Sequence, residues 1–441
     1  MLIEFSVGNF RSFKDQVSLS FVASNTKARD AYINKNNTIS VSDKLTLLTS
    51  LAIYGANASG KSNIVMALAF MSQLVLLSAN ESQAGVPLAV ESFRLSTETE
   101  NEPSFFEIVF LLDGRQFRYG FEVNRKQVIS EWLFSFQSAK ESTLFIRENN
   151  SIKPSSRFFK EGKGLEGKTR PNALFLSVVA QFNGEISEAI LKWFRNLGFV
   201  SGLDDMLYRA FTIQQVIDGK HKDEIIQLVK SLDLNISEIE GMKLDKSQVD
   251  IASSMPADVR ALFLKSIEGR DMLTVRTKHS KLDSNGKEVG LVSFDMDQNE
   301  SHGTQKAFYL AGPIIHTLAH GRVLVVDEME ARLHPLLTRE LIKLFNSLKT
   351  NPKRAQLIFT THDTNLLSNK LFRRDQIWFV EKDGFSASHL YSLAEIKIDD
   401  SKVRNDASFE NDYLQGRYGA IPFLGGVKTI ELGENNNDEE E

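Results

Sequence analysis

A glycine-rich segment near the amino terminus carries residues suited to binding a phosphate. Residues 53–62 read Ile-Tyr-Gly-Ala-Asn-Ala-Ser-Gly-Lys-Ser and match the pattern G-x-x-x-x-G-K-[ST]. Gly55 and Gly60 permit backbone angles at which successive N–H groups turn inward around a phosphate. Lys61 can then reach the β- and γ-phosphates, and Ser62 can ligate Mg²⁺. A plain glycine turn is the alternative interpretation, but it leaves the Lys-Ser pair unexplained.

Two adjacent acids, Asp327 and Glu328, offer the complementary chemistry. They follow the apolar β-forming run 323–326, which makes this a Walker B pattern. Asp327 at the strand end can hold Mg²⁺ through water beside Ser62, and Glu328 can orient or deprotonate an attacking water. An acidic pair alone is weak evidence, but together with the phosphate loop it predicts nucleotide hydrolysis.

Further residues are candidates for contact with phosphate. Ser301 and Gly303 stand where a hydroxyl and backbone N–H groups could grip a phosphate at the start of the helix expected over 304–319, although a simple helix cap is the alternative. His362 ends the strand expected over 356–360, where a γ-phosphate sensor could lie. Arg11 could lie beside the phosphates or be a surface arginine between two aromatic residues. The predicted nucleotide-binding residues are Gly55, Asn57, Gly60, Lys61, Ser62, Asn63, Arg11, Ser301 and Gly303.

The flanking sequence predicts the elements that must position these residues. An apolar run over 45–54 predicts a buried strand, and apolar residues at helical spacing predict a helix over 61–77. β-rich runs joined by turn residues predict antiparallel strands over 2–7, 17–23, 104–112, 115–123, 128–136, 142–147, 272–277 and 289–294.

Further predictions concern the regions between these elements. Residues 173–180 have the pattern of a buried strand, and the polar residues 25–43 suggest a mobile loop. Helical spacing over 185–197 and 223–232 predicts a small helical lobe over 182–270. No heptad pattern persists for three or four repeats, so we expect no long coiled coil.

Composition excludes several classes of protein. The 441 residues leave room for two or three compact units, and no apolar run reaches 18 residues, so no membrane span is expected. The absence of cysteine excludes disulfides and fits a cytoplasmic protein. The net charge of -5 equals the five acids of residues 434–441, so the rest of the chain is neutral and has no global basic footprint for nucleic acid. We expect that acidic tail to be solvated and disordered.

The order of these motifs resembles a known group of ATPases. Phosphate loop, Ser-His-Gly-Thr-Gln, Val-Asp-Glu, Glu-Ala-Arg-Leu-His-Pro and Thr-Thr-His-Asp together are similar to the ABC-type ATPases of the SMC, RecF and OLD group. The chain resembles most closely the stand-alone RloA or abortive-infection ATPases, often described as AAA-family. The resemblance extends from residues 9–13 to the late block 416–423.

This resemblance implies a fold and a division of the chain. The fold is an α/β ABC-type P-loop NTPase head, with a mixed central sheet, an antiparallel β subdomain and the inserted helical lobe. The expected domains are residues 1–181 and 271–400 for the two parts of the head, 182–270 for the lobe, and 401–441 for a carboxyl-terminal extension.

The resemblance also implies roles for single residues. Glu328, His362 and Lys61 would be catalytic, with His362 as the switch histidine, and Ser62 and Asp327 would hold Mg²⁺. Gln181 would be a Q-loop metal ligand, although no local motif fixes it. Ser301 and Gly303 would act in trans, on ATP held by a second copy in a head-to-tail dimer. His302 replaces a glycine of the transporter signature, which puts an imidazole near that phosphate.

The sequence also bears on other functions. A GTPase needs Asn-Lys-x-Asp, and residues 369–372 lack the aspartate. A nuclease could use Asp295 and Asp297, but they fall inside the ATPase region. The resemblance suggests an ATP-driven switch in anti-phage defence with a separately encoded effector such as a nuclease. The other hypothesis is a DNA-repair or chromosome-associated ATPase that binds DNA directly, with Lys140, Lys160, Lys163, Lys168 and Arg170 as candidate contacts.

Overall fold

The protein is described from a computed structural model. The structure describes residues 1–80, 83, 85–137, 140–232, 236–244, 272–398, 401–404 and 406–422. The expected acidic tail and residues 245–270 of the expected lobe therefore lie outside the described residues.

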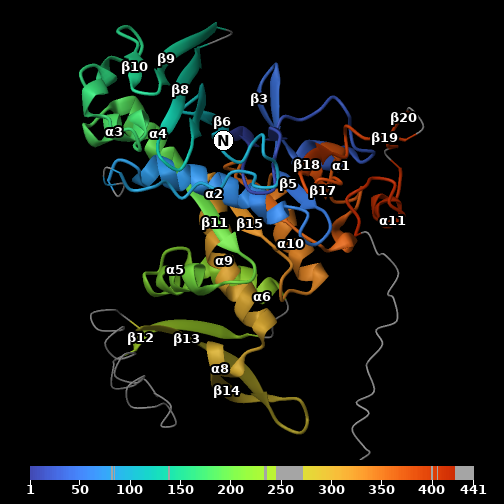
Figure 1. The fold of residues 1–441 in the computed structure, drawn as a ribbon. Coiled ribbons are helices and arrows are strands. Elements are labelled where there is room, and N and C mark those ends of the chain that lie inside the picture. The colour runs from blue at the N-terminus through green and yellow to red at the C-terminus, as the bar shows by residue number, and fades with distance from the viewer. Residues whose placement is uncertain are drawn as a thin grey trace, which may run out of the picture.

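A six-stranded sheet forms the centre of the nucleotide-binding half (Figure 1). Its strands lie in the order β11 (Leu197–Ser201), β15 (Val323–Asp327), β16 (Gln356–Thr360), β5 (Ser50–Tyr54), β17 (Ile377–Lys382) and β18 (Ser388–Ser392). All are parallel except β18, which pairs antiparallel with β17. Every residue of β5 and β16 is buried, as expected where helices cover both faces of a parallel sheet.

A seven-stranded antiparallel sheet forms the second layer. Its order is β10 (Ser151–Pro154), β9 (Lys140–Glu148), β8 (Val128–Gln137), β7 (Arg115–Val123), β6 (Ser104–Leu112), β1 (Leu2–Gly8) and β2 (Val17–Ser20). Alternate residues of β6 are buried, which is the pattern of a sheet with one face on a core. The two sheets confirm the predicted α/β head with a mixed central sheet and an antiparallel subdomain.

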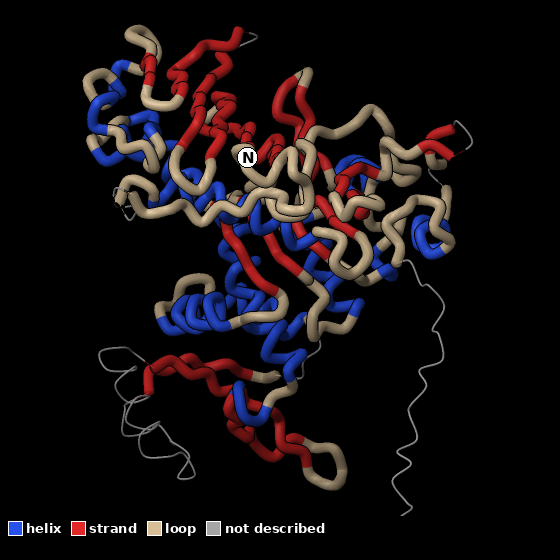
Figure 2. The backbone as a smooth tube through the Cα atoms, in the orientation of Figure 1, coloured by secondary structure: helices blue, strands red, loops and turns tan. Residues whose placement is uncertain are grey.

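Helix α2 (Lys61–Leu77) runs between the two sheets and connects their cores (Figure 1). Helices α3 (Phe175–Gln181) and α4 (Glu185–Arg195) pack on its carboxyl-terminal half, and Trp193 of α4 stacks on Phe110 of β6 with ring centroids 4.2 Å apart. A second core lies under the other face of the central sheet, against α9 (His302–His320) and α10 (Pro335–Phe345). Figure 2 shows strands of the seven-stranded sheet at the top of the view, with helices both beside and below them.

A smaller lobe lies below the central sheet in the view of Figure 1. Helices α5 (Met206–Ile217) and α6 (Lys222–Ser231) pack against α9, and α5 also contacts a three-stranded sheet. That sheet contains β12 (Glu238–Leu244), β13 (Met272–Leu282) and β14 (Glu288–Asp295), and it leads into the short α8 (Met296–Asn299). The region 182–270 is therefore not purely helical, since β11 belongs to the central sheet. Among the described residues no helix exceeds the 19 residues of α9.

The strand predicted over 173–180 is wrong, because this segment forms helix α3. Residues 175–180 are all buried, so no polar face reveals the period of 3.6 residues. A short run that is apolar on all sides cannot be assigned to helix or strand from periodicity alone.

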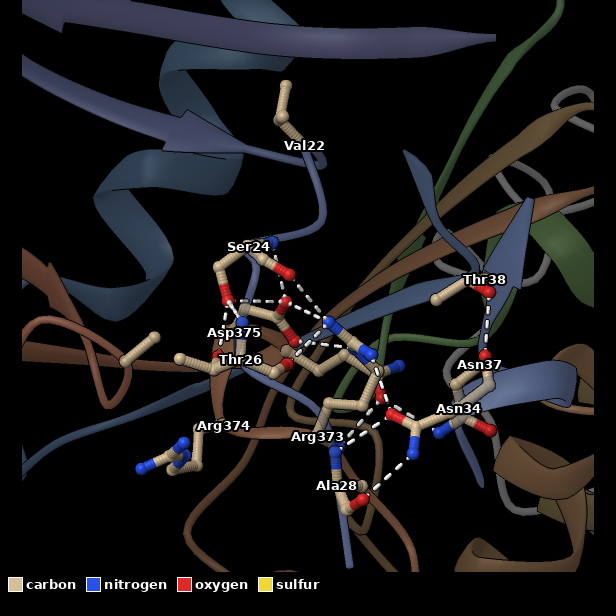
Figure 3. Close-up of polar contacts among 12 residues, drawn as sticks. Val22, Ser24, Thr26, Ala28, Asn34, Asn37, Thr38, Arg373, Arg374 and Asp375 are labelled. Carbon is tan, nitrogen blue, oxygen red and sulfur yellow. Dashed lines mark hydrogen bonds and ion pairs between the residues drawn. The ribbon is translucent and has the colours of Figure 1, made fainter. Parts of the chain in front are cut away.

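The loop predicted over 25–43 is also partly wrong, because it contains α1 (Ala31–Asn36) and β3 (Thr38–Ser42), which pairs with β4 (Leu45–Leu48). A buried ion pair between Arg373 and Asp375, 2.7 Å apart, holds this region in place (Figure 3). Arg373 donates to Asn34 Oδ1 at 2.8 Å, and Asp375 accepts from the backbone N–H of Ser24. Paired and hydrogen-bonded charges of this kind order a segment that local sequence leaves undecided.

The remaining elements lie at the carboxyl end. They are β19 (Lys397–Ile398), β20 (Ser401–Lys402) and α11 (Phe409–Leu414). Across the described residues, no helix combines the length and apolar character needed to cross a membrane.

Candidate nucleotide-binding site

The glycine-rich loop joins the end of β5 to the first turn of α2. Gly55 has φ 155°, and a Cβ placed there would lie 2.3 Å from the carbonyl oxygen of Val380 in β17. Gly60 has φ 113°, and its Cβ would lie 2.5 Å from Ser388 Oγ and 2.6 Å from Ser12 Oγ. Glycine is thus required at both positions by backbone angle and by close approach.

The loop borders an open cleft of about 700 Å³, the size of a small-molecule site. The lining residues are Asn57, Ala58, Ser59, Gly60, Lys61, Ser62, Asn63, Glu328, His362 and Lys382. The amino terminus of α2, which carries a partial positive charge, opens into this cleft. The structure therefore brings the phosphate loop, the second acid and the histidine to one site.

Lys61 is folded back onto the loop. Its Nζ donates to the carbonyl oxygens of Gly55 at 2.9 Å and Ala56 at 3.0 Å. Burial lowers the pKa of Lys61 to about 8, although the nearby Glu328, Glu330 and Asp327 oppose this shift. A phosphate in the cleft would supply negative charge that favours the ammonium form and raises the pKa of Lys61 again.

Ser62 and Asp327 form the candidate metal site. Ser62 Oγ donates to Asp327 Oδ1 at 3.1 Å, and Thr360 Oγ1 donates to the same oxygen at 2.6 Å. A hydroxyl and a carboxylate oxygen at this separation are the hard ligands that Mg²⁺ takes, together with water and substrate phosphate. The donor set therefore fits Mg²⁺, which would supply neutralising charge for a bound phosphate.

Glu328 directly follows β15 and has a left-handed backbone conformation, with φ 53°. Its N–H donates to Thr360 Oγ1 at 2.7 Å, and Met329 N–H donates to the carbonyl oxygen of Thr360. A non-glycine residue in this region carries strain of about 1–3 kcal/mol, which these contacts from β16 sustain. The side chain lines the cleft as a result, where a carboxylate can accept a proton from water.

His362 comes two residues after the end of β16, and β16 lies between β5 and β15 in the sheet. Its backbone N–H donates to Glu330 Oε1. Partial desolvation, and secondly the Lys61 ammonium, lower the pKa of His362, while Glu330, Glu328 and Asp327 act in the opposite direction. The ring is therefore neutral at pH 7 and can donate or accept a hydrogen bond at the cleft.

Two predicted phosphate contacts, Ser301 and Gly303, do not line this cleft. Ser301 is exposed and caps α9, accepting from Thr304 N–H at 3.1 Å. A Cβ on Gly303 would lie 3.2 Å from the carbonyl oxygen of Arg332, so the helix start sits against the loop 330–334. The cap interpretation is thus correct for the single chain, and it leaves the hydroxyl at the surface.

Arg11 lies close to the loop but faces away from it. Its guanidinium contacts Met66 Sδ at 2.7 Å on α2 and Glu91 Oε1 at 3.4 Å. The structure therefore does not bring Arg11 into the cleft. Its neighbour Ser12 is the residue that supports the loop, since Ser12 Oγ accepts from Asn63 Nδ2 at 2.7 Å.

Gln181 is not at the candidate metal site. It ends α3 and donates to Asn80, which lies beyond the carboxyl end of α2. Ser62 stands at the opposite end of that helix, and 17 residues of helix span about 25 Å. The prediction that Gln181 ligates the metal is not supported, because the segment predicted as a strand is a helix that turns away.

Asp295 and Asp297, the two acids that a nuclease could use, both make structural contacts. Asp295 caps α8, accepting from Asp297 N–H and Gln298 N–H, and Asp297 pairs with Arg209 and accepts from Tyr309 at 2.7 Å. These contacts hold α8 against α5 and α9. They account for both acids without a metal.

Sequence reasoning missed Lys382, Ser388 and Thr360. Lys382 ends β17 and lines the cleft, and Ser388 Oγ donates to the carbonyl oxygen of Ser59. Thr360 links both acids of the Walker B pair to β16. A cation at the end of an apolar strand was the available signal for Lys382, whereas the two hydroxyl residues gave none.

Comparison with known proteins agrees with this geometry. Residues 50–368 match the family model described as "AAA domain, putative AbiEii toxin, Type IV TA system". The chain belongs to this AAA family. The match begins at β5 and ends after η4 (Thr364–Leu366), so it contains the phosphate loop, both acids and His362.

The other comparisons add little to the AAA assignment. A solved structure of the SMC head domain from Thermotoga maritima is similar to this chain, with 13% identity over 90% of this chain and 99% of that chain, and a TM-score of 0.38. A search of curated proteins gave no match. The fold description accordingly rests on the strand order above, and membership of the AAA family makes the chain a P-loop ATPase-type protein.

Proposed function

We propose that this protein is an ATP-hydrolysing switch that closes into a head-to-tail dimer around two ATP molecules. The observation that carries the proposal is the convergence of Lys61, Ser62, Glu328 and His362 on one cleft, beside Asp327. Lys61 binds the phosphates, Ser62 and Asp327 hold Mg²⁺, Glu328 activates water, and His362 senses the γ-phosphate. Bound Mg²⁺ supplies charge neutralisation, and the protein supplies position.

The proposal of a dimer is supported by the position of Ser301 and Gly303 outside the cleft of their own chain. Ser301 and Arg332 are both exposed, the helix start at Gly303 sits against the carbonyl oxygen of Arg332, and neither residue lines the cleft. A helix start is a favourable site for an anion, and since this one lies outside the cleft of its own chain, the phosphate it binds would be that of another copy. ATP then joins the two copies, and hydrolysis releases them.

Size measurement on the Glu328→Gln variant tests the dimer. With ATP and Mg²⁺ we expect Glu328→Gln to run as a dimer, and Glu328→Gln/Ser301→Arg to remain a monomer with unchanged ATP affinity. Ser284→Arg in the same background is the control, because Ser284 is exposed in the β13–β14 turn and adds the same charge. An ATP-dependent dimer that tolerates Ser301→Arg contradicts the trans role.

The biological role we propose is anti-phage defence through a separate effector, such as a nuclease. Its support is the family description, which names a putative toxin of a toxin–antitoxin system. Co-purification of an ATP-dependent partner encoded beside this chain, lost in Lys61→Ala, is the test.

Direct DNA binding is the alternative function, and one surface favours it. Arg29, Arg374, Lys402 and Arg404 line a shared open pocket with the single acid Asp406. Figure 3 shows Arg374 apart from the polar network around Arg373. By contrast, Arg170 donates to the carbonyl oxygen of Ala79, and Lys168 covers the Phe182 ring. DNA affinity that falls with salt and is reduced by Arg374→Glu would favour this alternative.

A further inference from the structure

Three of the eight histidines gather where the lobe meets the end of α9. His316 and His320 lie four residues apart on one face of α9, and His221 directly precedes α6. One ring nitrogen from each lies within 4.8 Å of the other two. The rings of His316 and His320 are 4.3 Å apart, and those of His221 and His320 are 5.6 Å apart.

One of these histidines is oriented as metal ligands usually are. His320 Nδ1 donates to the carbonyl oxygen of His316 at 2.8 Å, which leaves Nε2 with its lone pair. A ligating imidazole commonly directs its other nitrogen at a carbonyl in this way. Glu224 Oε1 lies 3.8 Å from His221 Nδ1, beyond hydrogen-bond distance, so this carboxylate is not engaged by the imidazole.

His316 supplies an independent sign of a binding site. Its Nδ1 is buried and has no hydrogen-bond partner among the described residues. Burial, followed by Arg322, His320 and His221, lowers the pKa of His316 to about 4. The ring is therefore neutral at pH 7, which is the form that binds a metal ion.

Arg322 competes for the same imidazole. Its NH1 donates to His316 Nε2 at 2.6 Å, so the lone pair of that nitrogen is engaged and the ring proton is on Nδ1. A metal on Nε2 would replace the guanidinium directly. A metal on Nδ1 would move the ring proton to Nε2, which can no longer accept from Arg322. Arg322 must therefore move aside in either case.

We propose that His221, His316 and His320 form a binding site for a divalent transition-metal ion of the zinc type, closed by Arg322 when no metal is bound. Zinc takes imidazole nitrogens at about 2.0–2.1 Å in tetrahedral geometry, which needs nitrogens about 3.4 Å apart. Side-chain rotation of the exposed His320 can close the present spacing. Water or Glu224 is available for the fourth position.

The site would join two parts of the molecule. His221 lies at the start of α6 in the lobe, whereas α9 leads through Gly321 and Arg322 into β15, the strand that ends at Asp327. A metal bound here fixes α6 to α9. It also releases Arg322 at the base of the Walker B strand.

The test is zinc titration of the tag-free full chain by calorimetry, with excess Mg²⁺ to occupy Ser62 and Asp327. We expect saturable binding of one zinc ion per chain. His320→Ala should weaken it at least about tenfold, since loss of even an outer partner of a ligand costs 10–100-fold. Arg322→Ala should tighten binding, because it removes both a competing hydrogen bond and a like charge.

The control is His389→Ala, which replaces a partly exposed histidine of β18 that pairs with Asp383. Cobalt substitution adds a second readout, a tetrahedral visible absorption band that His320→Ala removes and His389→Ala keeps. Absence of saturable zinc binding by the wild type overturns the proposal, as does binding that His320→Ala leaves unchanged.

Discussion

Ser62 Oγ donates to Asp327 Oδ1 at 3.1 Å, joining the start of α2 to the end of β15 across 265 positions of sequence. These residues do not lie on neighbouring strands, because β16 separates β5 from β15. Thr360 at the end of β16 bridges the gap by bonding Asp327 and the N–H of Glu328. Three strand ends thus hold one candidate metal site.

Replacing Thr360 with valine should damage this site without changing its shape. The substitution leaves the Glu328 N–H without its partner and removes a bond from Asp327, so we expect a loss of about 1–3 kcal/mol in the free energy of unfolding. Weaker Mg²⁺-dependent ATP binding should accompany it. Urea denaturation and a Mg²⁺ titration are the measurements.

The matched control for that substitution is Thr338→Val. Thr338 is also fully buried, but its hydroxyl has no partner among the described residues, so valine should be neutral or stabilising. Equal effects of the two substitutions would mean that the Thr360 hydrogen bonds do not support the site.

Lys61 should make ATP binding dependent on pH. Its pKa is lowered to about 8 in the nucleotide-free protein, so the ammonium loses its proton as the pH rises from 7 to 9. Bound phosphate favours the charged form, and binding in that range therefore takes up a proton and weakens as the pH rises. Calorimetry in buffers of different ionisation enthalpy measures this uptake.

Lys61→Arg is the control for the pH effect, because arginine stays charged throughout that range. The ATP affinity that the Lys61→Arg variant retains should not change between pH 7 and 9. Proton uptake that persists in Lys61→Arg would assign the titration to another group.

The prediction of a phosphate site depends on signals that lie close together in the sequence. Gly55 and Gly60 need unusual backbone angles, and Lys61 and Ser62 follow directly on the helix that they begin. The mixed sheet was expected from the resemblance to ABC-type ATPases. The strand before the loop and the strand before Asp327 agree with it, because both are continuous apolar runs, which are typical of parallel strands.

Other features depend on contacts between distant segments. Helix α3 is buried on all sides, so its sequence shows no helical periodicity and predicts a strand. Gln181 was therefore expected at a strand end near the metal site, whereas it ends a helix. The support of the loop by Ser12 and Ser388 is a matter of tertiary packing that no spacing encodes. In the histidine cluster, the pair on α9 has visible helical spacing, but His221 joins it from 95 positions away.

Gln181→Ala should leave Mg²⁺-dependent ATP turnover unchanged, since Gln181 lies by Asn80 at the far end of α2. Asp327→Asn, by contrast, removes a charge from the candidate metal site and should abolish turnover at millimolar Mg²⁺. A phosphate-release assay over a range of Mg²⁺ concentrations compares the two. A raised Mg²⁺ requirement in Gln181→Ala would restore this residue as a ligand and imply a rearranged α3 in the ATP-bound state.

Glu328→Gln should separate ATP binding from ATP hydrolysis. The amide keeps the shape of the side chain but cannot accept a proton from water, so the rate should fall by about 10²–10⁴-fold with nearly unchanged ATP affinity. Single-turnover hydrolysis and equilibrium binding of ATP measure the two quantities. Glu330→Gln is the matched control: an amide oxygen can still accept from the N–H of His362, so its rate should fall far less. Similar losses in both variants would mean that the charge of this loop, and not the carboxylate of Glu328, drives hydrolysis.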